Sequence, residues 1–437
     1  MSRAPSLSNF IQACKNGNYK KSELIFRTCN QQERTKIAKA IVDQVNKRTT
    51  LHYFARFGNV EAINACLSLG IDKNVRDVNG WTSLLTSIAF RRFDIAAALI
   101  TSGANVNIPE KNGVTPIAFA AEIGHLPTID LLIEAGADPN ICGSEGSYPI
   151  IRAVNENQYA AVKKLIDAGA NLDVVDLDEG TALITAISTK RNEIAKLLID
   201  SGANLDIKNR EGITALLSAI HLNNAEMVSI LVEAGANVNL KVGEGVYPLA
   251  YAVGNGYEEI SIILLNSGAK MNRNPRNDHY PPAANVAGVG NVAMIDILLA
   301  FRVDFSCRSN VFDALIVASK EGKYEVVETL LAMRDVYPMK YPDDGTKTCF
   351  PALHSAAIPG YIDILKLLLA SGEDKNVKNM FHMTPYNCAE QNGQQEAMDL
   401  LMDDSYPSLE DKEKVQQRFV EIRNRIQQLR ETIVNHV

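Results

Sequence analysis

The chain has 437 residues, of which 46% are hydrophobic and 22% charged, a composition typical of soluble folded proteins. It carries 51 acidic against 44 basic side chains, which argues against nucleic-acid binding because phosphate contacts need clustered positive charge. We expect neither a signal peptide nor a membrane span, since no stretch of about 18 apolar residues occurs.

The cysteines are odd in number, scattered along the chain and never arranged as a CxxC pair. Such usage is typical of reduced thiols, so we predict no disulfide framework and a cytoplasmic or nuclear location. They are Cys14, Cys29, Cys66, Cys142, Cys307, Cys349 and Cys388.

Residues 1–48 have helical patterns, including Glu33 to Gln44, but not the repeat that follows them. We predict a helical N-terminal cap that shields the first repeat. The segment from Phe10 to Asn18 is a degenerate half-repeat within it.

A glycine recurs every 33 residues from Gly70 to Gly268. A longer apolar segment with helical spacing precedes each of these glycines, and a shorter one opened by Thr or Pro comes before that. Thr can cap free N–H donors, Pro suits a first helical turn, and Gly accepts the left-handed conformation after a helix. Each unit therefore predicts two short helices that must stack on their neighbours to bury their apolar faces.

This period and residue order resemble the ankyrin-repeat family, whose consensus combines a DxxGxTPLHxAA element, a GH turn and an LLxxGAxxN element. The best match runs from Asn112 to Ile117, through Gly124 and His125, and from Leu131 to Asn140. The resemblance covers residues 49–405, about eleven repeats, and implies an all-α repeat solenoid of stacked helix-turn-helix units with short hairpin-like connectors. It also implies protein binding without catalysis.

The pattern breaks in two connectors and at one helix end. Residues 272–282 gain one residue and carry Arg273, Arg276 and His279, and the connector at 335–349 is about five residues longer and carries Tyr337, Met339 and Tyr341. Arg302 replaces a turn glycine, where we expect it to be a poor left-handed cap. Both connectors have two interpretations: drift that a loop tolerates, or a protruding contact for a partner. The connector at 272–282 could also mark a bend in the stack.

Two further sets of side chains are candidate sites. Asp176, Asp178 and Glu179 form an acidic patch suited to a partner with a basic surface. The Asn of the LLxxGAxxN element is a position that some ankyrin proteins present for hydroxylation, although it could simply hydrogen-bond the connector. Its candidates are Asn107, Asn140 and Asn239.

Residues 406–437 predict one amphipathic helix. Its apolar stripe comprises Val415, Phe419, Ile422, Ile426, Leu429 and Ile433. We favour a helix docked on the last repeat over a dimerisation helix, because the stripe is shorter than most coiled coils need, and we therefore expect a monomer.

Most histidines have a structural explanation. The resemblance implies an inter-repeat hydrogen bond for His52 and His354, and His125 falls on the GH turn. Cys349, His354, His382 and Cys388 belong to two adjacent repeats, and we place His382 at an exposed connector tip. Their spacing along the chain fits neither a zinc site nor a cysteine nucleophile with a histidine base. We expect no catalytic site, metal or cofactor.

The sequence thus predicts a non-enzymatic scaffold or adaptor that binds a partner protein on the concave face and connector tips of a solenoid. Two narrower roles stay open. The chain could recruit substrates or regulate within a ubiquitin-ligase-type complex, or it could be a pathogen effector that binds a host protein.

Overall fold

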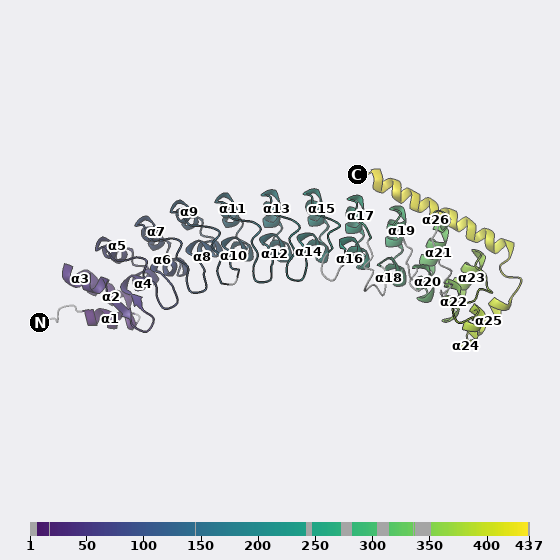
Figure 1. The fold of residues 1–437 in the computed structure, drawn as a ribbon, viewed down its shortest axis with the longest axis horizontal. Coiled ribbons are helices and arrows are strands. Elements are labelled where there is room, and N and C mark those ends of the chain that lie inside the picture. Colours follow the sequence, from purple (N-terminus) through teal and green to yellow (C-terminus); the bar gives the residue numbers. More distant parts are fainter. Residues whose placement is uncertain are drawn as a thin grey trace. The chain divides into compact units, whose positions relative to one another are not determined.

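The computed structural model describes residues 7–16, 18–144, 146–241, 247–271, 282–303, 314–334, 336 and 351–435. The chain divides into two compact units, Met1–Ser218 and Ala219–Val437, and each is described by itself. Repeated helix pairs make up most of both units, so the predicted all-α repeat solenoid is confirmed (Figure 1).

Unit 1 opens with a helical segment and a short hairpin. Its elements are α1 (Leu7–Lys15), α2 (Tyr19–Thr28), α3 (Gln31–Ala38), β1 (Ile41–Asp43) and β2 (Arg48–Thr49). The aromatic rings of Phe10, Phe26 and Phe54 pack together, with centroids 5.3 to 6.5 Å apart, and join this segment to the first repeat helix. All three rings are buried, and the N-terminal cap stays a prediction.

The prediction of helix from Glu33 to Gln44 is wrong beyond Ala38, because the chain reverses there into an antiparallel β-hairpin. The Asp43 carboxylate makes the turn: Oδ1 accepts from the backbone N–H groups of Val45 and Asn46, and Oδ2 accepts from the Asn46 amide at 2.6 Å. These bonds stabilise the ionised form and lower the pKa of Asp43. Such a side-chain turn competes with helix formation.

The repeats of unit 1 follow as pairs of a first and a second helix. These are α4 (Thr50–Phe57) with α5 (Val60–Ser68), α6 (Ser83–Ala89) with α7 (Phe93–Thr101), α8 (Pro116–Ile123) with α9 (Leu126–Glu134), α10 (Pro149–Asn155) with α11 (Tyr159–Asp167), and α12 (Ala182–Ser188) with α13 (Asn192–Asp200). First helices pack on first helices and second on second, which places the core between them (Figure 1).

Local sequence sets the helix ends as predicted. The hydroxyl oxygens of Thr82, Thr115 and Thr181 accept from backbone N–H groups of the first turn. The glycines that follow the second helices, from Gly70 to Gly268, all have positive φ. These ends satisfy backbone groups that a short helix would leave without a partner, and the repeat helices are as short as six residues.

Unit 2 continues the same arrangement, and α14 (Ala215–His221) spans the boundary. Its other helices are α15 (Ala225–Glu233), α16 (Pro248–Gly254), α17 (Glu258–Asn266), α18 (Pro282–Val289), α19 (Val292–Ala300), α20 (Ala314–Lys320), α21 (Tyr324–Met333), α22 (Ala352–Ala357), α23 (Ile362–Ala370), α24 (Pro385–Gln391), α25 (Gln395–Met402) and α26 (Leu409–Asn435). Arg302 does adopt the left-handed conformation, with φ 57°, so the turn forms in spite of its side chain.

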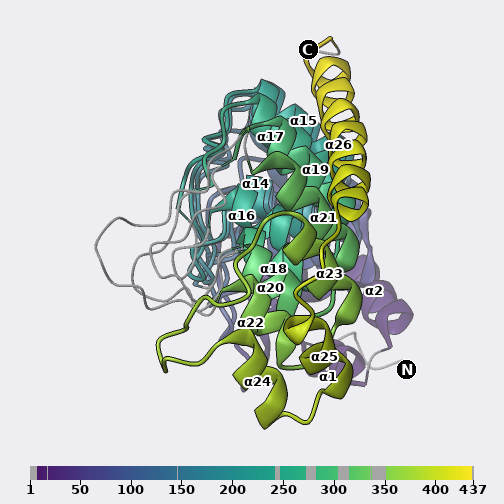
Figure 2. The ribbon, with the colours of Figure 1, turned by 90° about the vertical axis from the view of Figure 1, so that its right-hand side faces the viewer.

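Helix α26 lies along the second helices α19, α21 and α23 (Figures 1 and 2). Phe419, Ile422, Ile426 and Ile433 of the predicted stripe are buried. The helix therefore packs along several repeats, and docking on the last repeat was too narrow a prediction. Its 27 residues reach about 40 Å, enough to cross several helices spaced 8–10 Å apart.

Charged contacts fix the position of α26. The Arg425 Nη2 atom lies 2.9 Å from Asp296 Oδ1 on α19 and donates to Thr329 Oγ1 at 3.3 Å. Arg423 Nε donates to the Ala332 carbonyl oxygen at 2.6 Å. Burial raises the pKa of Asp296, and Arg425 offsets part of that rise. Arg425 therefore stabilises a buried carboxylate.

No helix among the described ranges is both long and apolar enough to cross a bilayer.

Replacing Arg425 with Ala should weaken unit 2 in a pH-dependent way. The variant leaves Asp296 buried without its cation, which should lower the free energy of unfolding by about 1–3 kcal/mol at neutral pH. This is less than for a fully buried ion pair, because the Arg425 side chain is 45% exposed. An acid whose folded-state pKa is raised loses stability as the pH rises through that pKa, so acidification should shrink the deficit. Urea unfolding across pH measures this.

The matched control is Lys414→Ala, which removes an exposed ion pair with Glu410 on the same helix. It should change stability by less than about 0.5 kcal/mol. Equal stability of the two variants at every pH would contradict the assigned role of Arg425.

Candidate functional site

Three adjacent hollows lie along the first helices and connectors of unit 1, with volumes of about 240, 490 and 390 Å³. Asn79 and Trp81 line both the first and the second, and Ser147 and Arg152 line both the second and the third. We call this continuous surface the first-helix groove. Its principal lining residues are Tyr53, Arg56, Asn79, Trp81, Phe90, Lys111, Phe119, Glu122, Ser147, Arg152, Asp176 and Asp178.

The connectors form one wall of the groove because each is a closed turn. Asp77 Oδ1 accepts from the N–H groups of Asn79 and Trp81, and Glu110 closes the next connector in the same way. Neighbouring tips are also joined, since Lys111 N donates to Asn79 O at 2.8 Å. Gly80 has φ +79°, and a Cβ there would lie 2.8 Å from Lys111 N, so this joint needs glycine.

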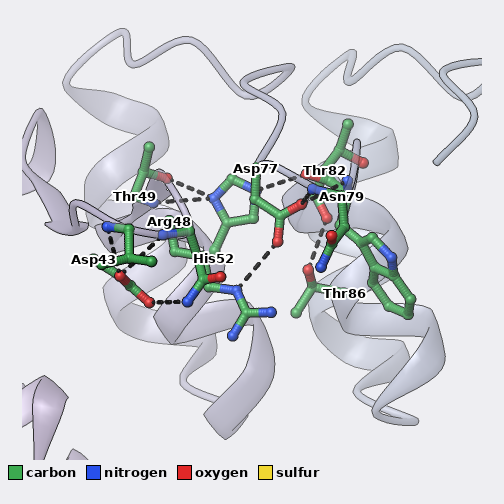
Figure 3. A network of polar contacts seen from close by, with 11 residues as sticks. Asp43, Arg48, Thr49, His52, Asp77, Asn79, Thr82 and Thr86 are labelled. Carbon is green, nitrogen blue, oxygen red and sulfur yellow. Dashed lines mark hydrogen bonds and ion pairs between the residues drawn. The ribbon is translucent and has the colours of Figure 1, made fainter. Parts of the chain in front are cut away.

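A buried polar network supports the first hollow (Figure 3). Asp77, whose side chain is 1% exposed, accepts from Arg48 Nε at 3.1 Å through Oδ2. His52 Nδ1 lies 2.8 Å from Thr49 Oγ1, and its Nε2 lies 2.9 Å from the Trp81 carbonyl oxygen of the next repeat. Burial lowers the pKa of His52, which keeps the ring neutral at physiological pH.

Aromatic and guanidinium groups line the middle of the groove. The Trp81 and Phe119 ring centroids are 5.5 Å apart, and the Arg152 guanidinium lies 5.5 Å above the Phe119 ring. Arg152 Nε also donates to the Glu122 carboxylate at 2.8 Å. Trp, Phe and Arg on a rigid framework are typical of the centres of protein interfaces.

The comparisons with known proteins identify this framework. A family model described as "Ankyrin repeats (3 copies)" matches residues 10–110, 98–178, 117–209, 150–242 and 183–275, and a model described as "Ankyrin repeat" matches residues 350–380. These segments cover more than half of the chain. The chain belongs to the ankyrin-repeat family. Ankyrin repeats are protein-interaction modules, which implies that this chain has protein partners.

Among solved structures, the human ASB11 ankyrin repeat domain is similar to this ankyrin-repeat protein. The two are 26% identical over 53% of this chain and 100% of that chain, with a TM-score of 0.42. No curated protein sequence gives a significant match.

The predicted acidic patch borders the third hollow of the groove. Asp178 and Glu179 are exposed, whereas Asp176 is half-buried, because its Oδ1 accepts from the N–H groups of Asp178 and Gly180. Arg210 of the next connector donates to the Leu177 carbonyl oxygen at 2.6 Å. The patch therefore presents two free-standing carboxylates and one that holds the turn.

Six other predicted contact residues lie outside the described residues. These are Arg273, Arg276, His279, Tyr337, Met339 and Tyr341.

The candidate Asn residues link neighbouring repeats of this ankyrin-repeat chain. Asn140 Nδ2 donates to Gly169 O at 3.1 Å, and its Oδ1 accepts from Asn171 N at 2.7 Å. Asn107 and Asn239 make the same pair of bonds one repeat ahead. This pairing agrees with the simpler of the two interpretations, a hydrogen bond to the connector, and hydroxylation stays a prediction.

The suspected Cys–His cluster has structural roles where it can be described. His354 Nε2 lies 2.8 Å from the Met383 carbonyl oxygen, which confirms the implied inter-repeat bond. Cys388 is buried, and burial raises the pKa of its thiol, while His382 is exposed at a connector tip. Cys349 lies outside the described residues, and the described part of the chain contains no group of three potential metal ligands.

Two sets of apolar residues at the surface were missed from the sequence. Trp81 and Phe119 were not singled out, although both are half-buried beside buried neighbours, Trp81 just before α6 and Phe119 within α8. In unit 2, Met380 and Phe381 are 48% and 59% exposed at a connector tip. The sequence alone could have identified Met380 and Phe381, since the equivalent connector tips at 77–80 and 110–113 are largely polar.

Substituting Asn140 should test the inter-repeat link. Asn140→Ala removes both bonds and should lower the free energy of unfolding by about 1–2 kcal/mol. Asn140→Asp keeps the acceptor, as Asp173 does toward Asn204 N at 2.8 Å, and should cost roughly half as much. Denaturant unfolding measures both.

Asn155→Ala, at an exposed position on α10, is the control and should stay within about 0.5 kcal/mol of the wild type. If Asn140→Ala also left the free energy of unfolding unchanged, the hydrogen bonds of Asn140 would add nothing to the stability of repeat stacking.

Proposed function

We propose that this protein is a non-enzymatic scaffold or adaptor that binds a partner protein in the first-helix groove and on the connector tips beside it. The observation that carries the proposal is the cluster of Trp81, Phe119 and Arg152 on a wall of hydrogen-bonded turns. Such anchors lose little conformational freedom on binding, because a closed turn holds Trp81 and the first helices α8 and α10 hold Phe119 and Arg152.

The chemical state of two buried thiols and of His52 supports a structural interpretation. A catalytic cysteine needs a lowered thiol pKa, whereas burial raises that of Cys14 to about 11 and that of Cys66 to about 12. The ring nitrogens of His52 lie within hydrogen-bond distance of Thr49 Oγ1 and the Trp81 carbonyl oxygen. The two buried thiols are therefore not activated, and His52 links neighbouring repeats.

Partner chemistry follows from the charges of the groove. At its third hollow, exposed Asp178 and Glu179 favour a basic part of the partner surface. The two inserted connectors, at 272–282 and 335–349, are proposed as further contacts. The same groove would serve either narrower role, recruitment to a ubiquitin-ligase-type complex or binding of a host protein by an effector.

The remaining features also favour this proposal. Burial of the apolar stripe of α26 within its own unit supports a monomer. The described cysteines are not paired in disulfides, which favours a cytoplasmic or nuclear location: Cys14, Cys29, Cys66, Cys142 and Cys388.

A bulky substitution on the wall of the groove should reduce partner capture. Asn79 is exposed between the first two hollows, so Asn79→Arg should obstruct both and lower recovery of a specific partner from lysate by about tenfold or more. Quantitative mass spectrometry of the captured proteins measures this.

Asn64→Arg is the matched control, because it makes the same change at an exposed position of the second helix α5. It should capture the partner as the wild type does. Undiminished recovery with Asn79→Arg would place the interface elsewhere.

A further inference from the structure

The first hollow of the groove, about 240 Å³ in volume, lies between α4 and α6 and has aromatic walls. Tyr53 and Trp81 are half-buried there, and Phe90 is 43% exposed. A cavity of this size is large enough for one large apolar or aromatic side chain. Its rim, however, is charged, and the balance of those charges determines which side chains it favours.

The acid of this hollow is already neutralised. Asp77 is buried, pairs with Arg48 through Oδ2 and closes its own turn through Oδ1. His52 contributes no charge, since burial lowers its pKa. The rim therefore keeps one net positive charge, that of Arg56.

Arg56 is held in place without a carboxylate. Its guanidinium carbon lies 4.7 Å from the centroid of the Phe90 ring and 5.9 Å from that of Phe57. Within the described ranges, no acidic side chain forms an ion pair with it. The turn after Phe90 adds Arg91 and Arg92, and Arg92 Nε donates to the Arg56 carbonyl oxygen at 3.3 Å. An arginine stacked on a ring keeps its N–H edge available for an anion.

Elsewhere in the chain, an arginine stacked on an aromatic ring also has a carboxylate partner. In the second and third hollows, the Arg152 guanidinium lies above the Phe119 ring and the Glu122 carboxylate accepts from it. At Arg56 the ring and the guanidinium are present, and the carboxylate is not. A ligand that brings an apolar side chain into the hollow could supply that carboxylate.

We propose that the first hollow binds an aromatic side chain together with an adjacent carboxylate, presented by the partner protein. The carboxylate comes either from a neighbouring Asp or Glu or from the carboxyl terminus of the partner. This inference rests on the proposed function, because it names what one end of the first-helix groove recognises. The two ends of the groove would then bind opposite charges of the partner, an anion at Arg56 and a cation near Asp178.

Trp81 is the single tryptophan of the chain and lines this hollow, so its fluorescence responds when a ligand binds here. Because Trp81 also lines the second hollow, the Arg56→Gln variant, which changes only the first hollow, is needed to assign the response. The probes are capped tetrapeptides Gly-Phe-Asp-Gly, Gly-Phe-Asn-Gly and Gly-Phe-Lys-Gly, titrated to about 10 mM because short fragments bind weakly. A second pair, acetyl-Gly-Gly-Phe with a free or an amidated carboxyl terminus, separates the two sources of carboxylate.

We expect one or both carboxylate peptides to bind about 3- to 10-fold more tightly than their neutral counterparts, and the Lys peptide to bind most weakly. Arg56→Gln should remove this preference and leave the neutral peptides unchanged. Arg91→Gln makes the same charge change beside the hollow, which Arg91 does not line, and should keep the preference.

Equal affinity of charged and neutral peptides, tighter binding of the Lys peptide, or no Trp81 response to any probe would overturn the inference. Each of these results leaves the capture experiment with Asn79→Arg unaffected. The failure of this inference is therefore distinguishable from the failure of the proposed function.

Discussion

The structure of this protein depends on the interface between adjacent repeats. A pair of helices with six to ten residues each cannot bury an apolar face alone, so every pair takes its stability from its neighbours. The polar bonds cross the same interface: His52 reaches the Trp81 carbonyl oxygen, and Asn140 reaches Gly169 and Asn171. Because these bonds hold the connectors in register, the surface that the connectors present is rigid.

That rigidity is what makes the first-helix groove a binding surface. Its tips are joined by backbone hydrogen bonds, such as Lys111 N to Asn79 O, so a partner would meet side chains already in place. The charges along it differ from one end to the other, with Arg56 at one and Asp178 at the other. A surface of this kind discriminates by charge order as well as by shape.

Sequence predicted the parts that local chemistry controls. Thr82 and Thr115 cap helices, the glycines of the 33-residue period take positive φ, and His52 bonds across repeats. The sequence did not predict contacts between residues that are far apart along the chain. Arg425 meets Asp296 across 129 positions, which determines where α26 lies. Arg152 reaches Phe119 and Glu122 of α8 only because the repeats stack. The hairpin after Ala38 depends on a side-chain turn at Asp43 that helical periodicity concealed.

The central claim is that a partner protein occupies the first-helix groove, and hydrogen exchange of the complex tests it most directly. With a captured partner bound, the backbone amides of the connectors at 77–81, 110–114 and 144–148 should exchange more slowly, while those of the second helices α7, α9 and α11 should not change. Protection confined to the second helices, or to α26, would contradict the account.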